Sequence, residues 1–160
     1  MQGHNWGRQH TWAYGWLHGN AWRGGESLVV EAITARVKLG ALVAPPLTLV
    51  VAEHAGERHL FTLPGSLLRA RGSFTTREFS FRAANAHARI HGHFSAETGD
   101  FAGLHYENPD GAMTYCLNSK IADGYVRLAV AGRPPFAART RAAALEIGTR
   151  DPDHGVKMLA

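Results

Sequence analysis

The chain has 160 residues, of which 45% are hydrophobic and 19% are charged, and this composition is typical of one globular domain. Cys116 is the only cysteine, which excludes an intramolecular disulfide and a zinc site built on cysteines. The formal net charge is +4, but no run of five like charges occurs, so nucleic-acid binding is not predicted. No apolar stretch approaches the roughly 20 residues that span a bilayer, and residues 1–10 resemble neither a signal peptide nor a lipidation signal. We therefore expect a cytoplasmic protein.

The first predicted strand is rich in aromatic residues. From residue 12 to residue 22, large aromatic or hydrogen-bonding side chains alternate with small or aliphatic ones. Such a face is apolar but offers indole, phenol, imidazole and amide groups, which suits the wall of a ligand pocket. The alternative is the ordinary core of a barrel. Because strand side chains alternate between two faces, one face would carry Trp12, Tyr14, Trp16, His18, Asn20 and Trp22.

Alternation with a period of two continues along the chain. It predicts further strands at 28–39, 47–53, 58–63, 78–82, 87–95, 112–121, 125–130 and 143–149. Turns are predicted at Pro64-Gly65, within 98–111 and at Asp123-Gly124, whereas 67–75 is ambiguous and the tail from residue 151 is typical of a loop. The alanine content of 138–149 also suits a helix, but aliphatic residues alternate with Glu146 and Gly148, which favours a strand.

About nine strands without a convincing long amphipathic helix predict an antiparallel all-β domain over residues 1–160. A barrel or a strongly curved sheet is the economical way to protect its edge strands. Small barrels hold one ligand in their mouth or interior, so a ligand pocket is the first functional expectation.

Five motifs are more specific than the strand pattern. They are GHNWG at 3–7, WAYGWLH at 12–18, LHYENPDG at 104–111, YCLNSK at 115–120 and LEIGTR at 145–150. Together they resemble the C-terminal half of the two-lobed lipocalin-like proteins. That superfamily includes the carotenoid 1,2-hydratases (hydroxyneurosporene synthases), the tocopherol-cyclase-like proteins and the AttH-like proteins. The resemblance covers nearly the whole chain.

The resemblance implies a lipocalin-like domain that forms one half of a larger protein. The expected partners are a missing N-terminal lobe or a second copy of the chain, together with an apolar isoprenoid or lipid. No cofactor is implied, and the substrate itself would bring the protein to a membrane. The alternatives are a non-catalytic lipid-binding domain and a purely structural lobe whose own side chains fill its pocket.

An isoprenoid substrate also implies a chemistry. Hydration or cyclisation begins with protonation of a C=C bond, after which the site must stabilise a carbocation. The aromatic face suits that demand, because each aromatic ring stabilises a cation by about 0.5–2 kcal/mol. Glu146 is the first candidate for the general acid, because burial among aliphatic residues would keep a carboxyl protonated. The alternative for Glu146 is a solvent-facing or salt-bridged strand residue.

Histidines form a second group of candidates. The alternating segment 87–95 places His87, His91 and His93 on one face, where one of them would serve as an acid, a base or a hydrogen-bonding group. His18 is a further acid–base candidate, and His18 or His105 would supply a third nitrogen to a metal, although no metal site is predicted. His4, Asn5 and Trp6 would form a tight turn before the first strand or contact a ligand. The predicted set is Glu146, His18 and His91 for catalysis and Trp12, Tyr14, Trp16, Asn20, Trp22, His93, His105, Tyr115 and Asn118 for ligand binding.

Overall fold

The computed structural model describes residues 11–25, 27–40, 42–62, 64–108 and 111–159. Within these ranges the prediction of an antiparallel all-β protein is confirmed. The strands are β1 (Ala13–Gly19), β2 (Leu28–Arg36), β3 (Lys38–Leu39), β4 (Leu42–Val43), β5 (Leu47–His54), β6 (Glu57–Leu60), β7 (Arg71–Phe74), β8 (Glu78–Ala84), β9 (Ala88–Ser95), β10 (Ala102–Glu107), β11 (Met113–Val130) and β12 (Phe136–Thr149).

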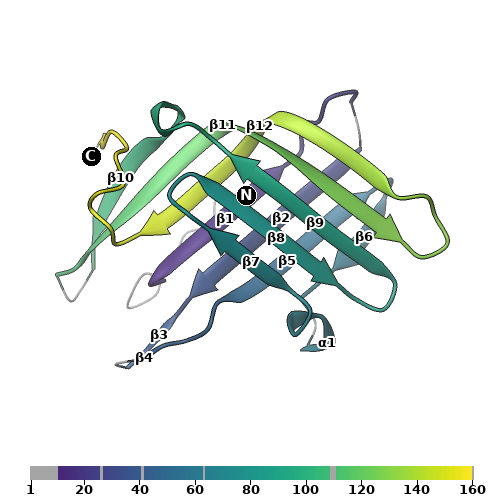
Figure 1. Cartoon of the computed structure of the whole chain (residues 1–160), viewed down its shortest axis with the longest axis horizontal. Helices are drawn as coiled ribbons and strands as arrows, with labels where there is room; N and C mark the ends of the chain where they lie inside the picture. The colour runs from purple at the N-terminus through teal and green to yellow at the C-terminus, as the bar shows by residue number, and fades with distance from the viewer. Residues whose placement is uncertain (1–10, 26, 41, 63, 109–110, 160) are drawn as a thin grey trace.

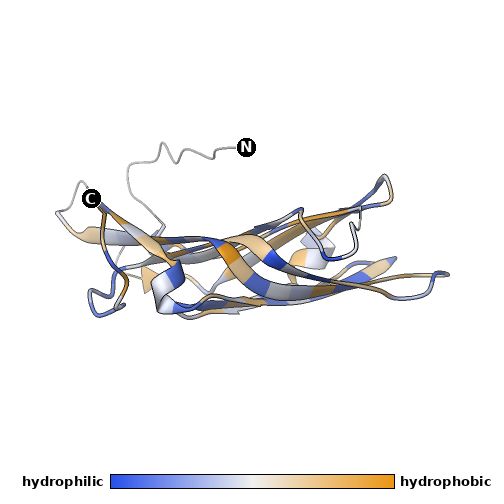
Figure 2. Ribbon diagram, turned by 90° about the horizontal axis from the view of Figure 1, so that it is seen from above, coloured by the Kyte–Doolittle hydropathy of each residue, from blue (hydrophilic) through white to orange (hydrophobic). Residues whose placement is uncertain are grey.

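Ten of these strands form one strongly curved sheet that is not closed into a barrel. Its order is β6-β5-β2-β1-β12-β11-β9-β8-β7, with β10 paired to β11, while β3 and β4 make a separate hairpin. The sheet folds over on itself into two layers, as Figures 1 and 2 show. The first layer contains β1, β2, β5 and β6, and the second contains β7, β8 and β9.

The two longest strands join the layers. β11 and β12 pair over most of their length and pass from one layer to the other (Figure 1). The pairing register of β11 shifts between Ser119 and Ala122 and again before Gly124. Such bulges bend a strand and exchange the side chains that face the core, so the core-facing positions include Leu117 and Ser119 before the shift and Val126 and Leu128 after it. The prediction of a turn at Asp123-Gly124 is wrong, because the bulge lets one strand continue through these residues.

The space between the layers is filled by side chains. The largest ones that are fully buried include Phe61, Phe79, Phe94, Leu17 and Leu145. The layers approach closely where β7 crosses β2: a Cβ atom added at Gly72 would lie 1.8 Å from Thr34 Oγ1, which itself is 3.0 Å from Thr48 Oγ1. This contact holds the edge strand β7 over the first layer without a hydrogen-bonded barrel closure.

Two further segments contain strands that the sequence analysis did not predict, and a third segment confirms its expectation. The ambiguous stretch 67–75 contains the end of the short helix α1 (Pro64–Leu67) and strand β7. The turn-rich stretch 98–111 contains the 3-10 turn η1 (Thr98–Asp100) and strand β10. β10 pairs with the first part of β11, which β9 does not reach. Residues 138–149 are strand, as preferred over a helix. Neither α1 nor any other helix in the described ranges is long and apolar enough to cross a membrane.

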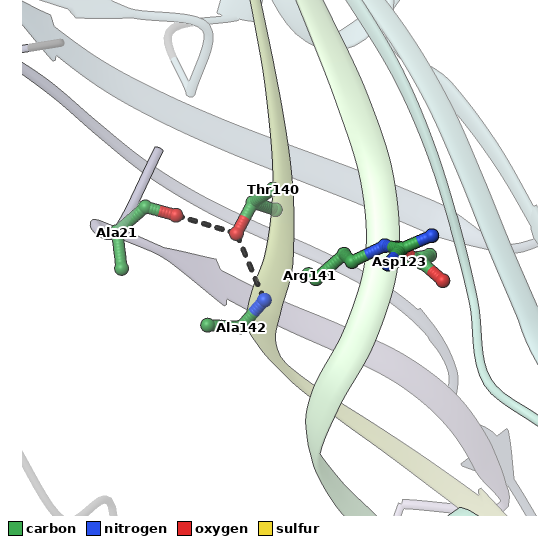
Figure 3. Close-up of polar contacts among 5 residues, drawn as sticks. All are labelled: Ala21, Asp123, Thr140, Arg141 and Ala142. Atoms are coloured by element: carbon green, nitrogen blue, oxygen red, sulfur yellow. Dashed lines mark hydrogen bonds and ion pairs between the residues drawn. The ribbon is translucent and has the colours of Figure 1, made fainter. Parts of the chain in front are cut away.

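The aromatic strand ends earlier than its alternation predicts. β1 stops at Gly19, and the chain then turns, with the Thr140 hydroxyl donating to the Ala21 carbonyl at 2.5 Å (Figure 3). The Trp22 ring folds back over Gly19 into the core, where its indole N–H donates to the Leu28 carbonyl at 2.6 Å. The prediction that Trp22 shares the face of Trp16 is therefore wrong, because the strand period no longer applies beyond Gly19, and Asn20 is an exposed residue just after the strand.

Candidate functional site

The remaining aromatic residues of β1 lie on the outer surface of the first layer. Gly15, Leu17 and Gly19 are buried toward the core, whereas Tyr14 and Trp16 are half-buried on the opposite side. Register pairing brings residues of the neighbouring strands β12 and β11 to the same side. We call this surface the aromatic face; it comprises Trp12, Tyr14, Trp16, His18, Tyr106, Cys116, Asn118, Lys120, Glu146 and Arg150.

The Tyr14 ring is the centre of this face. Tyr14 pairs with Gly148, and a Cβ atom added there would lie 2.1 Å from Tyr14 Cε1, so the ring packs directly on the glycine backbone. Without a side chain at Gly148, the ring extends across β12 toward β11. Its hydroxyl donates to Glu146 Oε1 at 2.5 Å and lies 3.5 Å from Cys116 Sγ.

These contacts form a chain of hydrogen bonds that connects residues of three strands, β11, β1 and β12. Asn118 Nδ2 donates to Cys116 Sγ at 3.1 Å, the thiol faces the Tyr14 oxygen, and the Tyr14 hydroxyl donates to Glu146. Chained hydrogen bonds polarise one another in a partly desolvated site, so each strengthens its neighbour. The arrangement holds the Glu146 carboxyl group at a defined place on the aromatic face.

Burial keeps the Tyr14 hydroxyl and the Cys116 thiol protonated. Burial is the largest cause that raises the pKa of Tyr14 far above its usual value, and the nearby Cys116 and Glu146 raise it further. Burial likewise raises the pKa of the Cys116 thiol to about 11, with a further contribution from Glu146. Both groups are therefore neutral hydrogen-bonding partners of the Glu146 carboxyl group at neutral pH.

The two tryptophans of the aromatic face are held by cations and a carboxylate. Trp16 Nε1 donates to Glu31 Oε1 at 3.1 Å, and its ring stacks on His18 with 6.2 Å between centroids. Lys120 Nζ lies 5.9 Å from the Trp16 ring centroid. Trp12 lies within 4.4 Å of the Arg150 guanidinium carbon and 5.2 Å of Lys38 Nζ, measured to its ring centroid. Cation–π contacts of this kind show that both rings accept positive charge on their faces.

Several predicted site residues lie elsewhere. His105 and Tyr115 oppose each other on β10 and β11, on the side away from Tyr14, and the Tyr115 ring packs 4.9 Å from that of His154. His91 and His93 lie on β9 in the second layer, where His93 Nδ1 is 2.8 Å from Ser80 Oγ. They do not share a site with Glu146, since core side chains fill the space between the layers. His4, Asn5 and Trp6 lie outside the described residues.

The histidines do not assemble a metal site with other ligands. Among the residues that the structure describes, no three side chains of His, Cys, Asp or Glu are grouped so that they could hold a metal ion. His18 stacks on Trp16 on β1, and His105 is exposed on β10, so neither adds a third nitrogen to His91 and His93.

The predicted site residues omit Cys116 and Tyr106 of the aromatic face and Gly148, on which the Tyr14 ring packs. The sequence pattern predicts Cys116 to be a small core residue and Tyr106 to lie in a turn-rich segment. Gly148 is predicted only as a small residue that alternates with aliphatic ones along a strand. Tyr106 lies close enough to the cluster that Cys116 and Glu146 add to burial in raising its pKa. Only the pairing of β10, β11, β12 and β1 reveals that these residues meet.

No family model matches this chain, and no curated protein or solved structure was found to match it.

Proposed function

We propose that the chain binds an apolar isoprenoid or lipid ligand on the aromatic face. The observation that carries this proposal is the hydrogen bond of 2.5 Å between the Tyr14 hydroxyl and Glu146, placed beside the Trp16 ring on the aromatic face. A carboxyl group so placed suits the oxygen-bearing end of a long apolar molecule, while aromatic rings suit its hydrocarbon.

The surface beside the aromatic face supports a long ligand. The outer side of β2 and β5 continues the first layer with aliphatic side chains, among them Val29 and Leu47, which are 42% and 48% exposed. A hydrocarbon chain laid along this surface would remove apolar area from water, with a gain of about 25 cal/mol per Å². The ligand site is thus proposed on the outside of the curved sheet, since core side chains occupy its interior.

A titration with farnesol and with oleic acid tests the proposal. Binding should change the tryptophan fluorescence, and equilibrium dialysis should show affinity that falls roughly tenfold in Trp16→Ala, because a partly buried aromatic contact is lost. Leu68→Ala is the matched control, since Leu68 is 78% exposed and follows α1 between β6 and β7. Equal losses in the two variants, or no binding of either probe, would contradict the proposal.

Catalysis at the same place is a second candidate, favoured by the position of Glu146. The hydrogen bond that Glu146 accepts from Tyr14 fixes its carboxyl group beside the Trp16 ring. In this reaction the acid form of Glu146 transfers its proton to one carbon of a C=C bond, and the neighbouring carbon becomes cationic beside the aromatic rings. Water adds to the cation through its oxygen and returns a proton to the Glu146 carboxylate, so the net change is addition of water.

The two glutamates of the first layer offer a matched pair for this test. Glu146 accepts a hydrogen bond from Tyr14, and Glu31 accepts one from Trp16. Incubation with a polyene in deuterated water should place deuterium on carbon in the wild type and in Glu31→Gln, but not in Glu146→Gln. Ligand binding without deuterium uptake in the wild type would leave a lipid-binding domain and eliminate the hydratase.

A partner surface is the alternative use of the same face, because the resemblance implies a second lobe or a second copy. Sedimentation of the chain over a range of concentrations distinguishes it from ligand binding. A dimer that Trp16→Ala separates into monomers, together with no response to farnesol, would assign the aromatic face to a protein partner.

A further inference from the structure

The outer surface of the second layer carries a row of positively charged and imidazole side chains on four adjacent strands. Arg71 on β7 lies opposite Arg82 on β8, and Arg82 lies opposite His91 on β9. His91 in turn lies opposite Arg127 on β11. Directly opposed side chains have Cβ atoms roughly 5 Å apart, so the row is continuous across the layer. We call this surface the basic face; a second row beside the first adds Ser73, Ser80, His93, Tyr125 and Arg139.

Within the described ranges, the arginines of the first row form no salt bridge with an acidic side chain. Salt bridges in the described ranges use Arg58, Arg133 and Arg141, and none involves Arg71, Arg82 or Arg127. Like charges directly opposite each other destabilise a sheet, so the pairing of Arg71 with Arg82 costs stability in the free protein. An anion bound between these side chains would remove that cost.

The basic face is hollowed where these side chains meet. The hollow is open, has a volume of about 460 Å³ and is lined by, among others, Arg71, Ser80, Arg82, His91, His93 and Tyr125. No Asp or Glu lines it. The polar part of its lining consists of cations, hydroxyl groups and imidazoles, all of which can donate hydrogen bonds to an oxyanion, and the rest is Gly72, Phe81 and Gly92.

Two members of the lining are held in place by the protein. Arg71 Nη1 donates to the Leu68 and Ala70 carbonyls at 2.9 and 2.7 Å, which leaves the other nitrogens of its guanidinium for a ligand. The hydrogen bond of 2.8 Å between Ser80 Oγ and His93 Nδ1 orients that pair across β8 and β9. Groups already ordered before binding lose less conformational entropy when a ligand arrives.

We propose that this hollow binds a phosphate or diphosphate group. Guanidinium groups bind phosphate oxygens through two parallel hydrogen bonds, and two of them directly opposed on neighbouring strands suit an anion with more than one negative charge. The phosphate belongs either to a soluble molecule or to a lipid headgroup, since both present the same oxygens to the hollow. This site lies on the layer opposite to the aromatic face and does not depend on the function proposed there.

Calorimetric titration with pyrophosphate at low ionic strength tests the proposal. We expect saturable binding that weakens at least about tenfold in Arg82→Ala, since a charge-assisted contact is lost. Arg141→Ala is the matched control: it removes one positive charge from β12, but Arg141 is already paired with Asp123 at 3.2 Å (Figure 3). Ser80→Ala, which removes a hydroxyl group and no charge, should also weaken binding.

Vesicles distinguish the two sources of the phosphate. If a lipid headgroup is the ligand, the protein should bind vesicles of phosphatidylcholine with phosphatidic acid in a way that depends on Arg82. Pyrophosphate should then release the protein from these vesicles. Vesicles of pure phosphatidylcholine should not bind the protein. Pyrophosphate binding without vesicle binding assigns a soluble ligand.

Three results would overturn the proposal. The first is no binding of pyrophosphate and no binding of phosphatidic-acid vesicles. The second is an equal loss in Arg82→Ala and Arg141→Ala, which would mean that only the total charge counts. The third is binding of single-stranded RNA that pyrophosphate does not displace, which would indicate a surface for nucleic acid.

Discussion

The two outer surfaces of this folded sheet satisfy their polar groups in opposite ways. On the aromatic face, Tyr14, Cys116 and Glu146 bond to one another, and cations lie against the tryptophan rings. On the basic face, Arg71 and Arg82 are opposed without a carboxylate nearby in the described structure. The comparison teaches that the aromatic face contributes to the stability of the free protein, whereas the basic face costs stability until an anion binds.

Truncating one side chain on each face should produce the largest difference between the faces in the free energy of unfolding. Tyr14→Ala removes a ring that packs on Gly148 and leaves the carboxyl group of Glu146 without its donor, so we expect a loss of about 3 kcal/mol in the free energy of unfolding. Arg82→Ala removes an exposed side chain and should change this free energy by less than about 0.5 kcal/mol. Urea denaturation of both variants measures the difference. Similar losses in the two would remove the distinction between the faces.

The Cys116 thiol should react slowly while the aromatic face is intact. Its pKa is raised from 9.0 to about 11, and two pH units correspond to a roughly 100-fold lower thiolate fraction near pH 8. The folded state therefore holds its proton more tightly than the unfolded state. This contribution to stability is fully present below pH 9 and is lost as the pH rises through about 11.

Alkylation with iodoacetamide, followed over pH 7–11, measures the predicted thiol reactivity. The reference is the same chain unfolded in guanidinium chloride, where the thiol should titrate near its ordinary pKa. If the folded protein is alkylated at pH 8 as fast as the unfolded chain, the Cys116 thiol is not buried as described.

A smaller loss in the free energy of unfolding should follow when Gly148, on which the Tyr14 ring packs, is substituted. In Gly148→Ala the added methyl group would lie within 2.1 Å of the ring, so the ring must move away from Glu146. We expect a loss of about 1–2 kcal/mol, in the range of other overpacked sites. Gly99→Ala is the control, because no atom lies within 4 Å of the added group there. Thermal unfolding of the two variants should therefore differ, and equal midpoints would contradict the packing of Tyr14 on Gly148.

The smallest effect should be a gain on the basic face. Neutralising one of the two opposed arginines in Arg82→Gln should raise the free energy of unfolding by a few tenths of a kcal/mol at low salt. The gain should vanish at 1 M salt, since screening removes repulsion between exposed charges. Arg58→Gln should show the opposite sign, because Arg58 is paired with Glu53 at 3.3 Å. Chemical denaturation at two salt concentrations measures both variants.

The proposed ligands provide the other way to sharpen the comparison. Pyrophosphate should stabilise the wild type through the basic face, and farnesol should do so through the aromatic face. Each stabilisation should survive the substitution made on the opposite face, because the core separates the two surfaces.

The sequence by itself determined the strand character of most segments and the common face of Tyr14 and Trp16, because a strand places every second side chain on one side. It could not predict that the strand ends at Gly19, since the fold of Trp22 into the core depends on residues of β2 and β12. It also could not predict the bulge in β11 that replaces the expected turn at Asp123-Gly124, because that bulge is set by pairing with β12 and β9.

Only the tertiary structure decided which side of each strand faces the core and which distant residues meet. Alternation identifies two faces of a strand but assigns neither of them to the interior. Tyr14 and Trp16 could therefore be expected to line a pocket, whereas they lie on the outer surface of the sheet. The contact of Tyr14 with Glu146 spans 132 positions in the sequence, and the row from Arg71 to Arg127 spans four strands. Such contacts follow from strand order and register, which are non-local properties of the sheet and leave no local pattern in the chain.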